Sequence, residues 1–419
     1  MFNKKSVLQR LLIFIFIAGI LTASSTTILL SRAALAADPS HITLTWDGDT
    51  RTTQTITWKT DSDTQEGMVE YWEDIPGKTG QKNILTALVE SVDSNCGTFL
   101  VHTATLTGLK PGTHYLYRVG SAEKWSAPHP FTTAPATPHP YRFLVFGDSQ
   151  SVNYDTWRTT LHQACLRNAD AAFFINMGDL VDVGQDYGQW AAWFTAAQGV
   201  LEKIPCMPIV GNHETYAPGA RFARPTLFTA QFKLPMNGPE GLKGQVYSFN
   251  YGDVHFVMLD SQLGEEENFV TDMLEKQKKW LESDLAAAQQ KWKLVFVHRA
   301  LYNNKARSNA AIQAGFAPIL DKYHADVVFT AHDHVYARTY PLYGGTAVAS
   351  PAEGTIYVAT GRSGSKTYVD SIAKEWDSFF YNPLGEPNYL SVNVVGNLLI
   401  VQAFRQNGEL IDEWNIAKK

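Results

Sequence analysis

The sequence predicts a layered α/β domain preceded by a small all-β domain, and three features support this division. Short runs in which apolar and polar side chains alternate fill residues 41–133, a pattern typical of half-buried antiparallel strands. Beyond residue 140, apolar strand-like runs alternate with longer helix-like stretches, which indicates layered α/β architecture. Between the two parts, Pro135, Pro138 and Pro140 exclude a helix or a central strand, so residues 135–140 are predicted to be an interdomain linker.

The first 36 residues have the pattern of a signal peptide. Basic residues at positions 4, 5 and 10 precede the apolar run 11–21, and Ala34-Leu35-Ala36 has the small residues that signal peptidase reads. We therefore expect cleavage near Ala36 and a mature protein that is secreted or held in the cell envelope, without stable membrane insertion. The alternative is an uncleaved membrane anchor, because residues 11–30 reach the ~20 residues that span a bilayer.

Charge and cysteine content limit the partners and the scaffold. Removal of residues 1–36 changes the formal net charge from −6 to −10, because this segment contains four basic and no acidic residues. A chain this acidic is not expected to bind nucleic acid or anionic membranes. Cys96, Cys165 and Cys206 lack the paired spacing of a zinc ribbon or a disulfide-dense scaffold. At most one disulfide can form, and three buried thiols are the preferred interpretation.

Residues 37–134 are predicted to form the all-β domain. The alternating runs 42–46 and 55–58 are separated by clusters of Gly, Asp and Thr. A Pro-Gly turn then precedes a strand in which Tyr115, Tyr117 and Val119 share one face, as at the tyrosine corner of a β-sandwich. The segment resembles a fibronectin type III domain. It contains no cluster of ligand-type side chains, so we expect its role to be structural.

Residues 141–419 are predicted to form the α/β domain. Apolar runs predict strands at 143–146, 171–175, 294–297 and 327–330, alternating with helices at 154–167, 189–201, 267–290 and 309–323. Further strand-like runs occupy 246–251, 255–259, 354–359 and 390–404. We therefore expect two sheets with helices outside them.

Five short motifs place a polar residue directly after an apolar strand. In doubly wound sheets the carboxyl ends of the strands are where ligands bind. Each motif is weak alone, because Gly-Asp pairs are common in turns, but their ordered sum within one domain is specific. The mixture of hard oxygen and imidazole donors suits iron, manganese or zinc rather than calcium or copper(I). The motifs are Gly147-Asp148-Ser149-Gln150, Gly178-Asp179-Leu180-Val181-Asp182, Gly211-Asn212-His213-Glu214, Val297-His298 and Ala331-His332-Asp333-His334.

This order of motifs resembles the calcineurin-like metallophosphoesterase superfamily. The flanking segments 244–261, 297–302 and 326–338 are most similar to its purple acid phosphatase branch, which the leading β domain also fits. The resemblance covers most of the mature chain. It implies a four-layer α/β/β/α sandwich with a dinuclear metal centre, preceded by the fibronectin-like domain.

The resemblance also assigns roles to the motif residues. It implies that Asp179 bridges two metal ions, that Asp148 and His334 complete one site, and that Asn212, His298 and His332 complete the other. A metal-bound hydroxide would be the nucleophile, because two cations acidify water and clamp the phosphoryl oxygens. His213 would protonate the leaving oxygen or hydrogen-bond the phosphate.

The chain departs from the purple branch at two positions. Asp182 stands where that branch has a tyrosine ligand, and Gln150 stands where the wider superfamily has a histidine. Tyrosinate bound to iron(III) gives the branch its colour, so we predict a colourless enzyme with two divalent ions, Fe, Mn or Zn. Gln150 and Asp182 each either bind a metal ion or only contact the residues that do. Four residues beside the motifs are candidates for contact with a phosphate or leaving group: Arg299, Tyr302, Tyr336 and Arg362.

The expected activity is acid phosphatase-like hydrolysis of small-molecule phosphate monoesters outside the cytoplasm. The alternative within the same class is a phosphodiesterase or nucleotide hydrolase, because pocket loops such as 215–241 choose the substrate. The alternative from another class is a non-catalytic envelope or adhesion protein, in which Gln150 and Asp182 mark a decayed metal site. Metal content and the effect of chelation distinguish these hypotheses.

Overall fold

The computed structural model describes residues 38–419 except residues 123, 220 and 307–308. The predicted signal peptide, residues 1–36, lies outside the described residues. Asp38–Lys419 forms one compact unit. None of the helices in the described chain is long and apolar enough to cross a membrane.

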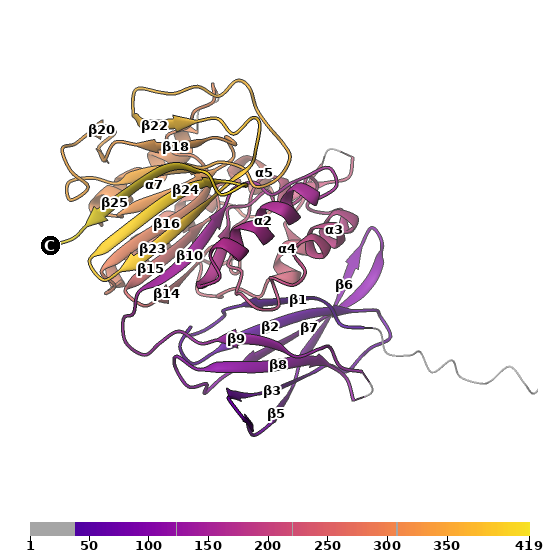
Figure 1. Cartoon of the computed structure of the whole chain (residues 1–419). Helices are drawn as coiled ribbons and strands as arrows, with labels where there is room; N and C mark the ends of the chain where they lie inside the picture. The colour runs from indigo at the N-terminus through magenta and orange to yellow at the C-terminus, as the bar shows by residue number, and fades with distance from the viewer. Residues whose placement is uncertain (1–37, 123, 220, 307–308) are drawn as a thin grey trace, which may run out of the picture. The chain divides into compact units, whose positions relative to one another are not determined.

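The N-terminal part consists of antiparallel sheets (Figure 1). Its strands are β1 Ser40–Thr45, β2 Gln54–Thr60, β3 Met68–Ile75, β4 Lys78–Thr79, β5 Asn83–Thr86, β6 Leu88–Ser94, β7 Gly97–Leu106, β8 His114–Gly120 and β9 His129–Thr132. One sheet has the order β1-β2-β7-β6, and the other has the order β4-β3-β8-β9 with β5 pairing with β3. Leu44 and Trp58 of the first sheet and Val69 and Tyr117 of the second are fully buried in one core, so the two sheets pack face to face.

Strand β8 carries the tyrosine corner that the sequence predicts. Tyr115, Tyr117 and Val119 share its buried face. The hydroxyl of Tyr115 accepts a hydrogen bond from the backbone N–H of Lys110 at 3.0 Å. This bond fixes the turn to the strand that follows it.

The α/β part contains two larger sheets. The five-stranded sheet has the order β11-β10-β23-β24-β25, and the seven-stranded sheet has the order β14-β15-β16-β17-β21-β18-β22. Their bounds are β10 Tyr141–Phe146, β11 Ala171–Asn176, β14 Tyr247–Tyr251, β15 Val254–Leu259, β16 Trp292–Arg299, β17 Val327–Ala331, β18 Tyr336–Thr339, β21 Ile356–Thr360, β22 Asp377–Tyr381, β23 Asn388–Val395, β24 Leu398–Arg405 and β25 Leu410–Ala417. Strand β10 is parallel to β11, and β15, β16, β17 and β21 are parallel to one another.

Helices and short hairpins complete this part of the chain. The helices are α2 Asp155–Arg167, α3 Tyr187–Ala197, α4 Thr226–Gln231, α5 Leu263–Glu266, α6 Met273–Ala287 and α7 Ala310–Lys322, with a 3-10 turn η1 at His213–Thr215. The hairpins are β12 Tyr216–Ala217 with β13 Arg221–Phe222, and β19 Leu342–Tyr343 with β20 Thr346–Ala347.

Alternate residues of the central strands belong to different cores, which places the sheets in layers. Phe256 of β15 contributes to the core shared with the five-stranded sheet, whereas its neighbour Val257 contributes to the core that contains Leu281 of α6. On the opposite side, Trp157 of α2 packs edge-on against Phe146 of β10, with ring centroids 5.4 Å apart. The order helix, sheet, sheet, helix confirms the predicted four-layer sandwich.

Three predicted elements differ from the structure. The helix predicted at 267–290 begins only at Met273 and ends at Ala287. The helix predicted at 189–201 runs from Tyr187 to Ala197, where Asp186 caps its start and Gly199, with φ +88°, follows its end. The run 390–404 is two antiparallel strands, β23 and β24, because Gly396 with φ +58° reverses the chain between them. Apolar periodicity alone does not reveal a tight turn inside a long apolar run.

The prediction of three buried thiols is confirmed for Cys206, holds in part for Cys165 and is wrong for Cys96. All three cysteines are free: Cys206 is buried, Cys165 is half-buried and Cys96 is exposed. Cys96 lies in the tight turn between β6 and β7, where its backbone N–H donates to the hydroxyl of Ser94. A turn of two residues holds its side chain away from the sheet core.

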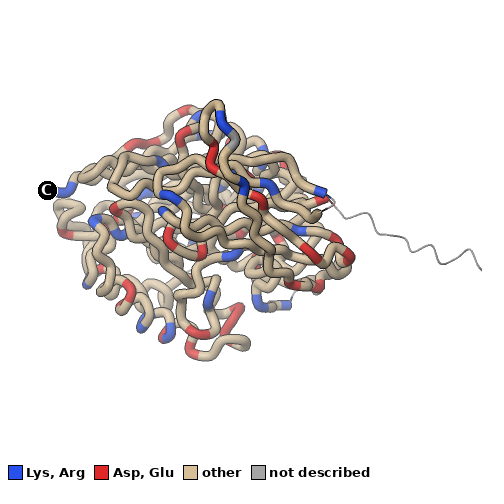
Figure 2. Tube along the Cα trace, turned by 90° about the horizontal axis from the view of Figure 1, so that it is seen from below, with Lys and Arg blue, Asp and Glu red and all other residues tan. Residues whose placement is uncertain are grey.

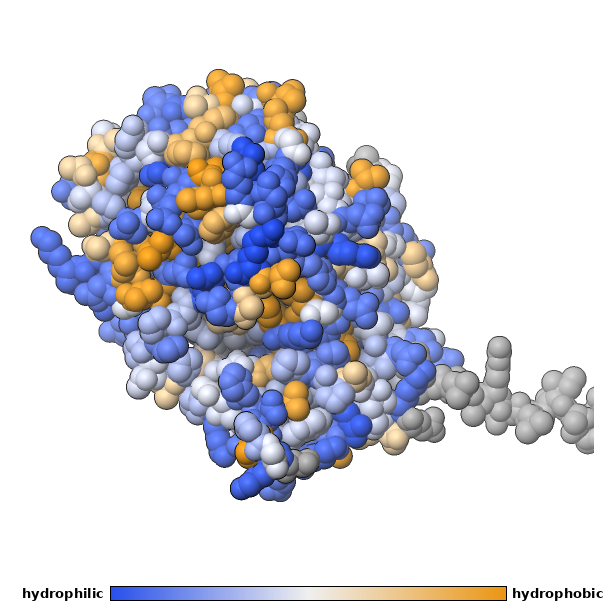
Figure 3. All heavy atoms as spheres, in the orientation of Figure 1, coloured by the Kyte–Doolittle hydropathy of each residue, from blue (hydrophilic) through white to orange (hydrophobic). Residues whose placement is uncertain are grey.

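Charged and apolar residues are distributed over the faces that Figures 2 and 3 present. In the view of Figure 2, Lys and Arg residues are interspersed with Asp and Glu residues along the described chain. Figure 3 shows apolar residues in separate groups among hydrophilic ones on the face that it presents.

A pair of buried carboxyl groups follows β15. Asp260 and Glu266 are fully buried, and the Nε2 of Gln245 donates to both, at 3.2 Å to Asp260 and 2.9 Å to Glu266. Burial, and then the charge of Glu266, raises the pKa of Asp260 well above its usual range, and burial raises the pKa of Glu266. The folded pair therefore keeps a proton that the unfolded chain releases above pH ~4.

We expect this pair to make the protein more stable in acid than at neutral pH. Its contribution is complete below pH ~4 and is lost as the pH rises through the raised pKa of the folded state. Asp260→Asn imitates the protonated form. The difference between its melting temperature and that of wild type should therefore become more positive from pH ~5 to pH ~8. Thermal unfolding of both proteins checks this. The exposed Asp170→Asn is the control, and an equal difference for Asp260→Asn at both pH values would contradict the prediction.

Candidate metal centre

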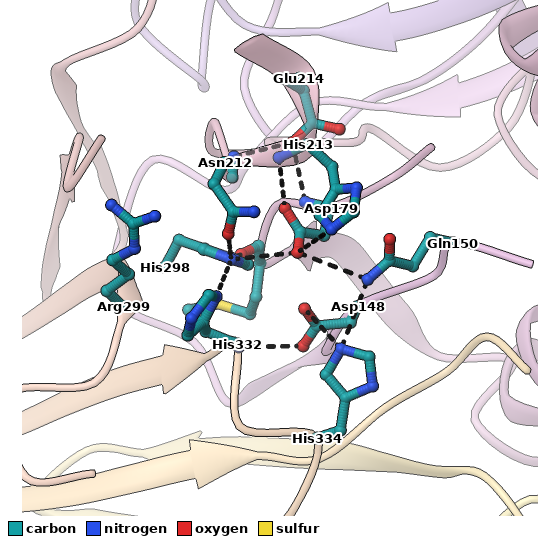
Figure 4. Close-up of polar contacts among 12 residues, drawn as sticks. Asp148, Gln150, Asp179, Asn212, His213, Glu214, His298, Arg299, His332 and His334 are labelled. Carbon is teal, nitrogen blue, oxygen red and sulfur yellow. Dashed lines mark hydrogen bonds and ion pairs between the residues drawn. The ribbon is translucent and has the colours of Figure 1, made fainter. Parts of the chain in front are cut away.

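Polar side chains from the carboxyl ends of four strands meet in one cluster. Asp148 follows β10, Asp179 follows β11, His298 lies near the end of β16, and His332 and His334 follow β17. Figure 4 shows these side chains pointing toward one another. Parallel strands of one sheet end at the same edge, which brings Asp148 close to Asp179 and His298 close to His332, and the packing of the two sheets brings these pairs together.

The cluster contains two groups of potential metal ligands that share one residue. Asp179, His298 and His332 offer ligand atoms within 4.8 Å of one another, and so do Asp148, Asp179 and His334. Asp179 therefore belongs to both groups. Asn212 joins the first group, because its Oδ1 lies 3.2 Å from the Nε2 of His298.

The chemistry of the donors fits bound cations. The Nδ1 of His334 donates to the carbonyl oxygen of Lys366 at 2.8 Å, so Nε2 is the ring nitrogen left to ligate a cation. This Nε2 lies 3.2 Å from the Oδ1 of Asp148, a buried oxygen that receives no hydrogen bond. An imidazole nitrogen and a carboxylate oxygen that face each other in the interior are suited to a cation between them.

The second group is oriented in the same way. The Nδ1 of His298 lies 2.8 Å from the carbonyl oxygen of Met177, which leaves Nε2 facing the Oδ2 of Asp179 at 3.3 Å. The Nδ2 of Asn212 donates to the hydroxyl of Tyr216 at 2.9 Å, so its amide oxygen is turned toward the cluster. Outer contacts of this kind set the ring tautomer and the amide orientation before an ion binds.

The charged groups of the cluster shift one another's pKa values. Burial disfavours a charge on Asp179, but His298, followed by His213 and His332, lowers its pKa well below the usual range. Burial also disfavours a charged His298, yet the carboxylate of Asp179 raises its pKa to about 9. Burial and the charge of His298 lower the pKa of His332. A bound cation would replace the proton on His298, so binding is expected to release protons.

The backbone of the cluster is unusual in two respects. Asp179, His332 and His334 have φ values of +52°, +67° and +57°, a region that non-glycine residues seldom adopt and that clusters at functional sites. Gly178 and Gly211 allow their two loops to touch. A Cβ on Gly211 would lie 2.3 Å from the Oδ1 of Asp179, and one on Gly178 would lie 2.6 Å from the backbone nitrogen of Gly211.

Glu214 holds the two loops together and was given no role by the sequence. It is fully buried, and its Oε2 accepts from the backbone N–H of Asp179 at 2.8 Å and of Gly211 at 2.7 Å. Its Oε1 accepts from the backbone N–H of Leu180 at 2.8 Å. The signal in the sequence was an acidic residue directly after Asn212-His213, but only the fold shows which backbone groups it meets.

Gln150 and Asp182 surround a lysine that the sequence analysis did not single out. The Nζ of Lys366 lies 3.2 Å from the Oδ1 of Asp182 and 3.4 Å from the Oε1 of Gln150. The amide nitrogen of Gln150 points toward Asp179 and His334, at 3.4 Å from each. An amide nitrogen cannot ligate a cation, so in this orientation Gln150 is a hydrogen-bond donor to the cluster.

His213 lies against Asp179 and is tightly oriented. Its backbone N–H donates to the Oδ1 of Asp179 at 2.9 Å, and its Nδ1 donates to the carbonyl oxygen of Asp182 at 2.6 Å. The other ring nitrogen, Nε2, lies 3.9 Å from the Oδ2 of Asp179 and 3.3 Å from the Nζ of Lys366. The ring also packs on Tyr216, with centroids 4.6 Å apart.

Three of the four residues expected to contact substrate are turned away from the cluster. Tyr336 is fully buried and donates to Asp412 at 2.8 Å. Arg362 is buried and donates to the carbonyl oxygens of residues 364, 383 and 384. Tyr302 is buried between the rings of Tyr357 and Trp376. These expectations were wrong because adjacency to a motif along the chain does not decide where a side chain points.

The fourth, Arg299, lies beside the cluster but has a partner of its own (Figure 4). Its guanidinium forms a two-pronged ion pair with Glu265, with the Nη1 3.0 Å from Oε2. Only 8% of the Glu265 side chain is exposed, so most of the charge of Arg299 is neutralised locally.

Two family models match the described chain, one in each part. Residues 141–336 match the family described as calcineurin-like phosphoesterase. Residues 39–133 match the family described as purple acid phosphatase, N-terminal domain. The fold and the ligand cluster thus define the class of this protein as a metal-dependent phosphoesterase.

Relatives and solved structures agree with this class. Acid phosphatase type 7 of Mus musculus is 25% identical over 344 residues, covering 75% of this chain and 76% of that protein. Purple acid phosphatase 15 of Arabidopsis thaliana is 27% identical over 300 residues, covering 64% and 54%. The structure of a purple acid phosphatase from yellow lupin seeds superposes with a TM-score of 0.77 at 20% identity, covering 91% of this chain and 74% of that one. The chain belongs to the calcineurin-like metallophosphoesterases, in the purple acid phosphatase branch that carries an N-terminal domain.

Proposed function

We propose that this protein hydrolyses phosphate monoesters of small molecules at a centre of two metal ions. The observation that carries the proposal is that Asp179 belongs to both groups of potential ligands, because a carboxylate shared by two groups can hold two cations next to each other. The names of the relatives, acid phosphatase and purple acid phosphatase, support the same activity.

The side chains of the cluster divide between the two ions. Asp148, Asp179 and His334 would hold one cation, and Asn212, His298 and His332 would hold the other together with Asp179. Oxygen and imidazole donors suit Fe, Mn or Zn as divalent ions. When bound, such ions neutralise phosphoryl oxygens and lower the pKa of water.

His213 is proposed to contact the leaving oxygen or the phosphate. Its backbone bond to Asp179 and its Nδ1 bond to Asp182 hold the ring still, and they leave Nε2 as the ring atom that faces the cluster. A positioned acid of this kind accelerates a reaction by ~10²- to 10⁴-fold. Hydrolysis of a phosphate monoester requires a far larger acceleration, so most of it would come from the metal ions.

The organisation and the location of the chain form part of the proposal. We propose a signal peptide at residues 1–36, a β domain at 37–134, a linker at 135–140 and a catalytic domain at 141–419. The matches to family models at 39–133 and 141–336 support these boundaries. Export to the cell envelope or the medium rests on the pattern of the first 36 residues.

Purified mature protein is expected to contain two metal ions per chain and to hydrolyse an aryl phosphate monoester faster than the corresponding diester. Chelation should abolish activity, and added Mn²⁺ or Zn²⁺ should restore it, because the ligand cluster does not otherwise supply a nucleophile. Metal analysis and initial rates on the same sample measure these properties. The sample should show no visible absorption band from charge transfer between tyrosinate and iron(III), because Asp182 stands where the purple branch has its tyrosine ligand.

The same measurements separate the alternatives. Faster hydrolysis of the diester would favour the phosphodiesterase or nucleotide hydrolase. A folded protein without metal and without activity would favour the non-catalytic envelope protein. Circular dichroism before and after chelation is the control that distinguishes loss of metal from loss of structure.

A further inference from the structure

The ammonium group of Lys366 lies at the edge of the candidate metal centre. Its Nζ is 3.2 Å from Asp182, 3.3 Å from the Nε2 of His213 and 3.4 Å from Gln150. It thus faces the two positions at which this chain departs from the purple acid phosphatase pattern. It also faces the ring nitrogen that is directed toward Asp179.

The main chain fixes where this lysine stands. The carbonyl oxygen of Lys366 accepts from the Nδ1 of His334 at 2.8 Å, so the residue is tied directly to a proposed ligand. The segment around it is also anchored, because the backbone N–H of Ser365 donates to the Ser151 hydroxyl at 3.1 Å. Substitutions of the lysine side chain leave these main-chain contacts in place.

The charge of Lys366 is more available than that of Arg299. About a third of its side chain is exposed, 35%, and its acidic partner Asp182 is 41% exposed. An ion pair this exposed is screened by water and contributes little to folding. Arg299, in contrast, is 18% exposed and doubly bonded to the nearly buried Glu265. A purely structural ion pair therefore explains the presence of Arg299 better than that of Lys366.

We propose that Lys366 binds a non-bridging oxygen of the substrate phosphate and thereby favours dianionic monoesters over monoanionic diesters. The proposal rests on the proposed function, because it requires a phosphoester bound beside His213. The Oε1 of Gln150 and the carboxylate of Asp182 accept from the ammonium group, which holds the lysine at the rim beside His213. A monoester presents one more negatively charged terminal oxygen than a diester does, so an extra cation distinguishes the two.

The test compares Lys366→Met and Lys366→Arg with wild type in the metal-loaded enzyme. Losing a charged hydrogen bond should lower kcat/KM for an aryl monoester by about 10- to 100-fold, mainly through KM, and change the diester value by less than about threefold. Lys366→Arg should recover most of the loss, because it keeps the charge. The surface variant Lys322→Met, whose lysine pairs with Glu282, should behave as wild type.

Binding of inorganic phosphate supplies a readout besides activity. By calorimetry, Lys366→Met should bind orthophosphate at least about tenfold more weakly, while metal analysis still finds two ions per chain. The proposal would be overturned if Lys366→Met lowered kcat/KM equally for the monoester and the diester and left the affinity for phosphate unchanged. Lys366 would then be a positioning residue for His213. If wild type hydrolyses neither ester, the proposed function fails, and the phosphate affinities still decide whether Lys366 binds phosphate.

Discussion

Replacing Asp179 by alanine is expected to reduce kcat on a phosphate monoester by on the order of 10³-fold or more, since charge stabilisation by metal ions is worth several kcal/mol. Asp179 is only 2% exposed, and its carboxylate belongs to both ligand groups. It also accepts the backbone N–H of His213 at 2.9 Å. Its loss therefore weakens both metal sites and the orientation of His213 together.

Metal analysis must accompany these kinetics. Asp179→Ala should lose one or both ions, whereas a control at the exposed Asp170 should keep both ions and full activity. Single loss of His334, which belongs to one group only, should leave the other ion bound. Retention of two ions and normal kcat in Asp179→Ala would show that the two groups do not form a shared centre.

Replacing Glu214 by alanine is expected to damage both stability and metal binding. Three backbone N–H groups, of Asp179, Leu180 and Gly211, would lose their acceptor in the interior. Each buried unsatisfied donor costs about 1–3 kcal/mol, so the free energy of unfolding should fall by roughly 3 kcal/mol or more. The loops that carry Asp179 and Asn212 would separate, and metal affinity should fall with them.

Denaturant unfolding and metal titration measure the two effects. Glu240→Ala, whose side chain is 86% exposed, is the matched control and should change neither. A Glu214→Ala protein with wild-type stability and two tightly held ions would mean that other groups satisfy these loops. Glu214→Gln should be intermediate, because one amide oxygen still accepts while the new N–H₂ faces backbone donors.

Much of the fold was predictable because its elements are long and periodic. Strands β10, β11, β16 and β17 were all located within a few residues, since each is an apolar run with a polar residue at its end. The hairpin between β23 and β24 was missed, because the turn at Gly396 depends on a left-handed backbone rather than on periodicity. The exposed Cys96 was missed for a similar reason.

The members of the metal cluster were predictable for a different reason. Residues directly after parallel strands emerge at one edge of a sheet, so Asp148 and Asp179 were expected to lie together after β10 and β11, and His298 and His332 after β16 and β17. The packing of the two sheets brings these pairs together. Tyr302 and Tyr336 carried no such constraint. Proximity to a motif along the chain places a residue near the site but leaves the direction of its side chain to the packing.

The sequence by itself determined the architecture, the family and the order of oxygen and imidazole donors along the strand ends. Only the tertiary structure decided which outer groups complete the site: Glu214 beneath the loops, and Lys366 at the rim. Lys366 and His213 are 153 residues apart in the chain, and their contact at 3.3 Å depends on how the two sheets and their loops pack. Periodicity is a local property of the chain, whereas contacts of this kind arise from the register and packing of whole layers.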